Sequence, residues 1–180
     1  MLFVALLAPL LFAADPIPTP TKIVDGYQSE TWGMNADEVR KVVPDLKPAG
    51  QHHFTSEASI AGFPVTLHHF FLGEKLALVR IVFKDSSRAQ YDRLRALLIE
   101  KYGATTIDKV DFDDSIVGLV KHSIWRGESS EIRIDLIAFA GSKSEPTTSI
   151  AYQQSSTVAE LDKQTKADAA AARDEIKKSL

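Results

Sequence analysis

The chain has 180 residues, of which 44% are hydrophobic and 25% charged, and its formal net charge is −3. This composition is that of an ordinary globular protein with one domain or two small repeated halves, and it argues against a nucleic-acid partner, which calls for a basic surface. The chain has no cysteine, so disulfides, a catalytic thiol and cysteine-based zinc sites are excluded.

The chain opens with an apolar run. The run Leu2–Ala14 carries no charge, and its 13 residues are too few to span a bilayer, which takes about 20. It is typical of a secretory signal, with Leu11 and Ala13 at positions −3 and −1 of a cleavage site; a buried amino-terminal strand is the alternative. We expect a signal peptide over residues 1–13, a proline-rich linker over residues 14–30, no transmembrane span, and a periplasmic or secreted protein.

The stretch MNADEVRKVV predicts a short helix. Asn35 is a favourable N-cap, and Glu38 three residues later completes the pattern of a capping box. Met34 and Val39 are spaced as a hydrophobic staple, and Pro44 prevents the helix from continuing.

Three strand patterns follow, over residues 52–62, 63–72 and 75–84. Gly62 and the sequence GEK at residues 73–75 separate them, at spacings typical of hairpins. Period-two alternation assigns one set of side chains to the core of an antiparallel sheet. That set is Phe63, Val65, Leu67, His69, Phe71, Ala77, Val79, Ile81 and Phe83.

A second helix is predicted over Arg88–Tyr102. Ser87 and Gln90 have the spacing of a capping box, and Gly103 is a natural helix end. Its apolar side chains recur at steps of three and four residues, as one helix face requires. They are Tyr91, Leu94, Leu98 and Tyr102, with Leu97 beside them.

Strand patterns return over residues 115–127, 130–139 and 147–154. In the middle strand Ile132, Ile134, Leu136 and Ala138 alternate and are expected inward. Residues 155–180 are rich in Ala, Lys, Asp and Glu and favour a helix with a thin apolar stripe. We expect this helix to be docked or solvated rather than to form a coiled coil, since it has too few heptads.

The predicted fold class is α+β. Two successive α-β-β-β units, over residues 31–154, are expected to form one antiparallel sheet with both helices on one face, followed by the carboxy-terminal helix. The element order repeats twice, although the two halves share no obvious sequence identity.

The helix start WGMNADEV, the later LRALLIEKYG and the strands SIWRG and EIRIDL resemble small exported bacterial envelope proteins. The families concerned are the BamE-like outer-membrane assembly domains and the related tandem fold of beta-lactamase inhibitory protein. The chain departs from them in lacking the cysteine of a lipid anchor and the disulfides of the inhibitor. The resemblance implies a non-enzymatic binding or assembly module.

Histidines in the predicted strands are the main candidates for chemistry. They are His52, His53, His68, His69 and His122. Adjacent strand residues point to opposite faces, so each neighbouring pair offers one imidazole to a given face. A metal site needs such histidines from several strands in register, and we expect sheet-surface or core-edge histidines instead, with no metal and no cofactor.

The sequence DKVDFDDS carries four aspartates, Asp108, Asp111, Asp113 and Asp114. A calcium loop that started at Asp111 would need glycine at its sixth position, where Ile116 stands, so we expect a solvated acidic loop. Hydrolase signatures such as GxSxG and phosphate loops such as GxGxxG are absent.

The sheet face away from the helices is expected to be solvated and to bind a partner. By alternation it carries Thr66, His68, Phe70, Arg80, Arg133, Asp135, Ile137 and Phe139. The predicted binding residues are His68, Phe70, Arg80, Trp125, Arg133 and Asp135, although core packing is the commoner fate of a tryptophan.

These patterns indicate an exported, non-catalytic module that binds a protein or an envelope component. The alternative is a small periplasmic metal-binding protein or hydrolase that uses the strand histidines. It requires His68 or His69 close to His52, His53 or His122, with a carboxylate nearby. A third possibility is a structural oligomer formed through residues 156–180.

Overall fold

A computed structural model describes residues 25–113, 118–139, 146–161, 163–164 and 167. The expected signal peptide, most of the expected linker and most of the expected carboxy-terminal helix lie outside these residues. The elements in chain order are β1 (Gly26–Tyr27), β2 (Glu30–Thr31), α1 (Ala36–Val42), β3 (Lys47–Gly50), β4 (His53–Ile60), β5 (Phe63–Leu72), β6 (Lys75–Phe83), α2 (Arg88–Tyr102), β7 (Ile107–Asp113), β8 (Gly118–Arg126), β9 (Ser130–Phe139) and β10 (Thr147–Gln154), followed by a 3₁₀ turn, Ser155–Thr157.

The α+β class with an antiparallel sheet is confirmed. Eight strands form one antiparallel sheet in the order β3-β4-β5-β6-β10-β9-β8-β7, and β1 and β2 form a separate two-stranded ribbon. Four strands follow each helix rather than the expected three, because β3 and β7 each precede a predicted strand. The expectation of a solvated acidic loop was wrong for Asp108, Asp111 and Asp113, since these residues belong to β7, which pairs with β8. Asp114, the fourth aspartate of that loop, lies outside the described residues.

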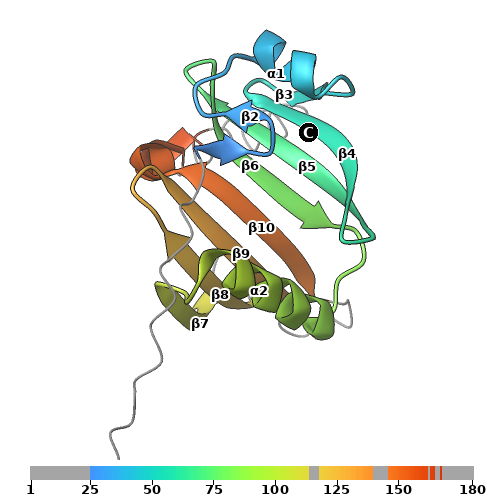
Figure 1. Cartoon of the computed structure of the whole chain (residues 1–180), viewed down its shortest axis with the longest axis vertical. Helices are drawn as coiled ribbons and strands as arrows, with labels where there is room; N and C mark the ends of the chain where they lie inside the picture. The colour runs from blue at the N-terminus through green and yellow to red at the C-terminus, as the bar shows by residue number, and fades with distance from the viewer. Residues whose placement is uncertain (1–24, 114–117, 140–145, 162, 165–166, 168–180) are drawn as a thin grey trace, which may run out of the picture.

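The two halves of the chain meet along their last strands. Strand β6 pairs with β10 in antiparallel register, with Ile81 opposite Ile150 at the seam. The first strands of the halves, β3 and β7, form the two outer edges of the sheet. Figure 1 shows α1 and the ribbon at one end of the molecule and α2 lying in front of the strands of the other half.

Both helices begin where the sequence predicts. Asn35 caps α1 with the full capping box, because its side chain accepts from the Glu38 N–H while the Glu38 carboxylate accepts from the Asn35 N–H. At α2 the Ser87 hydroxyl accepts from the Gln90 N–H, and the helix ends at Gly103 with a φ of 83°. These interactions fix the positions of the helices that frame the face described below.

The helices pack on one face of the sheet, which we call the helix face. Its core joins Val39 of α1 and the predicted stripe of α2 to inward side chains of both halves. Buried members from the strands are Val65, Leu67, Phe71, Leu76, Val79, Ile81, Phe83, Trp125, Ile132, Ile134, Leu136 and Ile150. Removing this much apolar area from water is the main stabilising contribution to such a fold.

Two residues predicted to face this core do not. The register shifts between Phe70 and Phe71, which pair with Leu78 and Leu76, so that Ala77 is the extra residue of a bulge. Ala77 therefore packs on the opposite face, with Leu78. Ala138 is exposed near the end of β9.

The opposite face of the sheet, here called the second face, is partly covered. Leu161, in the helical turn after β10, is buried against Ala77, Leu78 and Ala151. The Gln164 side chain donates to the Phe71 carbonyl oxygen at 3.3 Å. The expectation of a wholly solvated face was therefore wrong in its centre, where the start of the carboxy-terminal segment docks. Within the described part of the chain, no helix is both long and apolar enough to cross a bilayer.

Candidate functional site

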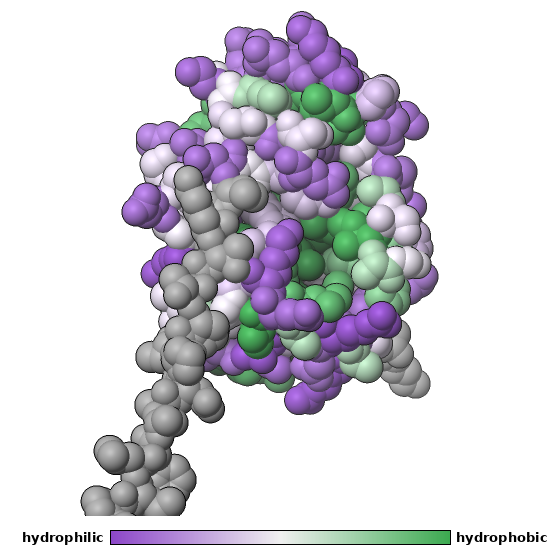
Figure 2. Space-filling view, viewed as in Figure 1, coloured by the Kyte–Doolittle hydropathy of each residue, from purple (hydrophilic) through white to green (hydrophobic). Residues whose placement is uncertain are grey.

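A cavity of 430 Å³ lies on the helix face between α2, the ribbon and the sheet seam. Figure 2 shows this face hollowed above α2, with hydrophobic residues inside the hollow and hydrophilic residues around it. Its walls are formed by Gly26, Tyr27, Gln28, Ile60, Ala61, Ile81, Leu94, Leu97, Leu98, Lys101, Tyr102, Ile150 and Tyr152. A largely apolar cavity with a few polar groups is the usual form of a small-molecule site.

Both halves of the chain contribute to the apolar walls. Ile81 and Ile150, which pair across the seam, are buried and belong to β6 and β10. Leu94 and Leu98 come from the buried stripe of α2. Leu97 is 44% exposed although it lines the same cavity, so an apolar side chain lies where the cavity meets solvent.

Three tyrosines bring polar atoms into this apolar space. The ring of Tyr27 lies 5.1 Å from that of Tyr152, and Tyr102 lines the same cavity. The Tyr27 hydroxyl accepts from the Gln28 amide nitrogen at 3.0 Å. Burial, with a smaller contribution from the charge of Glu30, raises the pKa of Tyr27 to about 12. Burial also raises the pKa of Tyr152, so these hydroxyls keep their protons at neutral pH.

The ribbon has a backbone geometry that places Tyr27 over the cavity. Gly26 has a φ of 156°, and a Cβ at this position would lie 1.8 Å from the Glu30 carbonyl oxygen. Two other lining residues, Gln28 and Ala61, have φ of 53° and 51°, which is uncommon outside glycine. Both residues lie in hairpin turns, where a positive φ is common, and both turns form part of the cavity wall.

A buried hydrogen-bonded chain attaches the ribbon to the sheet. The Nδ1 atom of His69 lies 2.8 Å from Glu30 Oε2, and its Nε2 atom lies 3.1 Å from the Ser56 hydroxyl. Because an ionised carboxylate only accepts, Nδ1 donates to it. Glu30 belongs to β2, and the other two residues belong to β4 and β5. These hydrogen bonds therefore hold β2, the strand next to Tyr27, against the first half of the sheet.

The order of serine, imidazole and carboxylate in this chain is also that of a hydrolytic triad. A triad must present its hydroxyl to a substrate. Ser56 is 4% exposed and His69 is 0% exposed, so neither side chain reaches the surface or lines the cavity. The arrangement is therefore suited to holding the ribbon in place. No short sequence motif marks it, since the three residues come from separate strands.

The structure brings three of the predicted binding residues together on the second face. His68, Phe70 and Arg80 lie beside His53, whose ring stacks on Phe70 with centroids 4.5 Å apart and an interplanar angle of 2°. The Nε2 atom of His53 lies 2.9 Å from Nδ1 of His68. Burial, followed by the charges of His69 and Arg80, lowers the pKa of His53. Burial, followed by the charges of His53 and Arg80, lowers the pKa of His68.

The other three predicted binding residues lie apart from this cluster. Arg133 and Asp135 are paired with each other on β9, where the guanidinium donates to the carboxylate at 2.7 Å. Asp135 is buried, so it offers little free surface. Trp125 lies on the helix face, 2% exposed, and its indole donates to the Gly103 carbonyl oxygen at 2.8 Å. Of the two predicted roles of Trp125, partner binding and core packing, the structure shows core packing.

The positions of the histidines meet the first requirement stated above for a metal site, which is that two imidazoles from different strands lie close together. His53 and His68 are adjacent, but the described residues contain no group of three or more His, Asp or Glu side chains arranged around a common point. His122 is buried on β8, and its closest carboxylate contact is Asp111 at 3.7 Å. Burial and the charge of Arg133 lower the pKa of His122.

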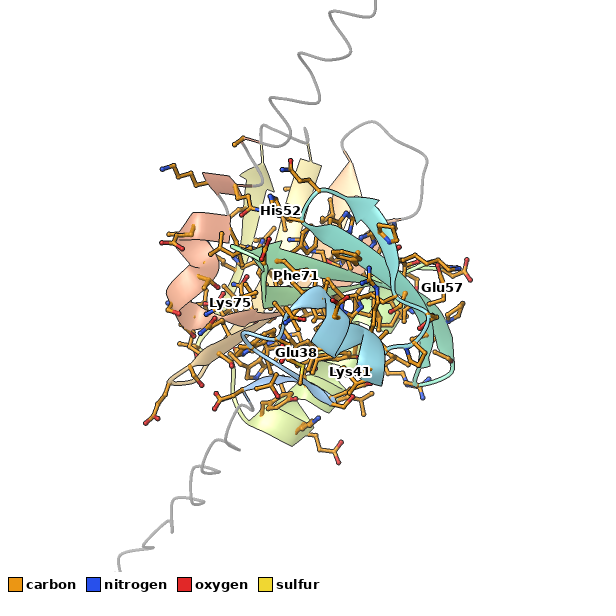
Figure 3. The ribbon with its side chains drawn as sticks, turned by 90° about the horizontal axis from the view of Figure 1, so that it is seen from above. Glu38, Lys41, His52, Glu57, Phe71 and Lys75 are labelled. Atoms are coloured by element: carbon orange, nitrogen blue, oxygen red, sulfur yellow. The ribbon has the colours of Figure 1, made fainter. Side chains whose placement is uncertain are left out.

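A second hollow of 430 Å³ lies beside α1. It is lined by Asn35, Ala36, Asp37, Gln51, His52, Phe54, Phe71 and Glu74. The Phe71 N–H donates to the His52 carbonyl oxygen at 2.9 Å, and Figure 3, seen from above, shows Phe71 between His52 and α1, which carries the labelled Glu38 and Lys41. Strands of the first half and the loop before α1 form this hollow, without the seam or the tyrosines, so we take the more apolar cavity beside α2 as the candidate site.

Sequence reasoning did not find the cavity residues Tyr27, Gln28, Lys101 and Tyr152. The one available signal was the sequence GYQ at residues 26–28, a tyrosine within a glycine turn. Tyr27, Tyr102 and Tyr152 come from three distant segments, which only the tertiary fold brings together. Comparisons of the chain with models of protein families, with curated proteins and with solved structures found no match.

Proposed function

We propose that the chain is an exported, non-catalytic binding module that holds a small, mainly apolar molecule in the cavity between α2 and the ribbon. The observation that carries this proposal is the convergence of both halves on one apolar cavity with three tyrosines. Hydroxyls with a raised pKa inside a well-formed apolar cavity are a usual mark of a ligand site. The inaccessible Ser56 hydroxyl supports binding over hydrolysis.

Export is the part of the proposal that rests on sequence. The uncharged run before residue 15 is typical of a secretory signal, which favours the periplasm or secretion beyond it. The resemblance to BamE-like and inhibitor-like envelope proteins favours the same class, namely binding or assembly without catalysis.

A titration with the neutral fluorescent probe Nile red tests the proposal. The purified protein is expected to bind the probe with saturation. Leu97→Trp, which adds volume at the mouth of the cavity, should weaken binding at least tenfold. Leu119→Trp is the matched control, because Leu119 is 52% exposed on β8 and does not line the cavity. Absence of saturable binding, or equal binding by the two variants, overturns the proposal.

A second candidate function is binding of a protein or envelope partner through the second face. The observation that favours it is the half-exposed cluster of His53, His68, Phe70 and Arg80, which gathers rings and a cation as interface anchors do. A partner captured from envelope extract should be lost when Phe70→Ala is combined with Arg80→Glu, with circular dichroism unchanged. Retention of that partner by the variant excludes this face.

A further inference from the structure

The charged and polar groups that line the cavity offer an excess of hydrogen-bond donors. Among the described residues that line it, Lys101 is the one with a formal charge. Its ammonium lies 5.0 Å from the centre of the Tyr102 ring, which places a cation beside one of the tyrosines of the cavity. An ammonium supplies three donors and no acceptor.

The hydroxyl protons add to this excess of donors. The Tyr27 oxygen accepts from Gln28, and no described residue accepts the proton of that hydroxyl in turn. Tyr102 and Tyr152 also line the cavity, and each of their hydroxyls carries one proton. Hydroxyl protons and an ammonium are thus available at the polar side of the cavity. A group that only accepts, such as a carboxylate, satisfies such a set of donors best.

Glu30 is an acidic side chain close to these groups, and it is already engaged. Glu30 contributes to the raised pKa of Tyr27, and its charge acts against an anion near the ribbon. Its carboxylate accepts from His69 and is 3% exposed, so it does not line the cavity. The anionic end of a ligand is therefore best placed toward Lys101, on the α2 side, and the apolar body toward Ile81 and Ile150 at the seam.

We infer that the ligand of this cavity is an amphiphile with an apolar body and one terminal carboxylate, which Lys101 and the Tyr102 hydroxyl bind. This inference rests on the proposed function and names the class of molecule that the cavity takes. The apolar walls alone would accept neutral and charged molecules of the same shape, so the discrimination resides in Lys101.

Three probes of equal chain length test the inference by displacement of bound Nile red: decanoate, decan-1-ol and decylamine. Decanoate is expected to bind at least tenfold more tightly than decan-1-ol, and decylamine more weakly than either. Lys101→Met, which keeps the aliphatic stem and removes the charge, should reduce the preference for decanoate to less than twofold. Lys75→Met, an exposed lysine at the start of β6, is the control and should keep the preference.

The outcomes separate the inference from the proposed function. Equal binding of decanoate and decan-1-ol, or a preference that survives Lys101→Met, overturns the inference and leaves a neutral ligand in the cavity. Failure of all probes, Nile red included, overturns the proposed function itself. Circular dichroism of each variant shows that the fold is retained, and Lys101 is exposed on α2, so its replacement leaves the core intact.

Discussion

His53 and His68 face each other across neighbouring strands with their ring nitrogens 2.9 Å apart. One imidazole must donate and the other accept, so at least one of them has to be neutral. Two protonated rings at this distance would repel each other, and Arg80 adds a third positive charge. Protonation of both imidazoles at acidic pH therefore weakens this contact.

The free energy of unfolding should fall as the pH drops below the ordinary histidine pKa of 6.5. Both folded-state pKa values lie below that of the unfolded chain, so the unfolded chain takes up protons first and gains stability on acidification. Urea unfolding between pH 7.5 and pH 5 measures this fall. The variant His53→Phe with His68→Phe should flatten the slope, while the residual dependence from His122 has the same sign. An NMR titration that places either midpoint above 6.5 contradicts the prediction.

Breaking the bond between Glu30 and His69 should be costly, because it leaves a buried polar group without its partner. Glu30→Leu or His69→Leu alone is expected to lower the free energy of unfolding by about 3–5 kcal/mol. The double variant should recover much of this loss, because it buries apolar groups in place of the pair. Urea denaturation measures all three. Equal losses in the double and single variants would show that the pair is not an isolated unit.

Fluorophosphonate probes should not label Ser56. The hydroxyl is hydrogen bonded to an imidazole, but at 4% exposure a probe cannot approach it in the folded protein. Mass spectrometry of the treated protein measures labelling, with Ser56→Ala as the control. Stoichiometric labelling that disappears in this variant would support the hydrolase alternative.

Trp125 should behave as a core residue. Trp125→Ala is expected to cost about 3–5 kcal/mol of stability, as large-to-small core changes do. Trp125→Phe should cost less but lose the bond to the Gly103 carbonyl, a contribution of about 1 kcal/mol. A loss below about 1 kcal/mol for the alanine variant in chemical denaturation would be inconsistent with its burial.

Gly26→Ala should displace the ribbon and weaken Nile red binding by tenfold or more, because the new Cβ meets the Glu30 carbonyl at 1.8 Å. Gly33→Ala is the matched control. Its φ is 90°, but an added Cβ there has no atom within 4 Å, so it carries backbone strain alone. Fluorescence titration of both variants measures the difference. Equal binding would show that the ribbon does not form the cavity wall.

The sequence predicts those parts of this fold that depend on neighbouring residues. The capping side chains of Asn35 and Ser87 and the alternation in β5 and β9 act over a few positions, so both helices and these strands were predicted correctly. Strand β7 was missed because Asp108, Lys109 and Asp111 follow no apolar alternation. This edge strand is held by polar contacts instead, since Asp108 accepts from Ser123 and Arg95.

The candidate site depends on contacts between distant residues. His68, Phe70 and Arg80 were grouped correctly on one face because alternation within two paired strands determines it. The placement of Trp125 required knowing which face of β8 is buried, and both of its faces are apolar in part. The cavity required the ribbon, α2 and β10 to meet, which no local pattern encodes.

The position of β10 has a consequence for how the protein is made. The last strand of the sheet in chain order lies at its centre, between β6 and β9. A ribosome-bound chain that lacks it has no partner strand along one edge of β6 and no strand pairing between its halves, so the sheet closes only after synthesis has passed residue 154. Until then the sheet remains open along one edge of β6.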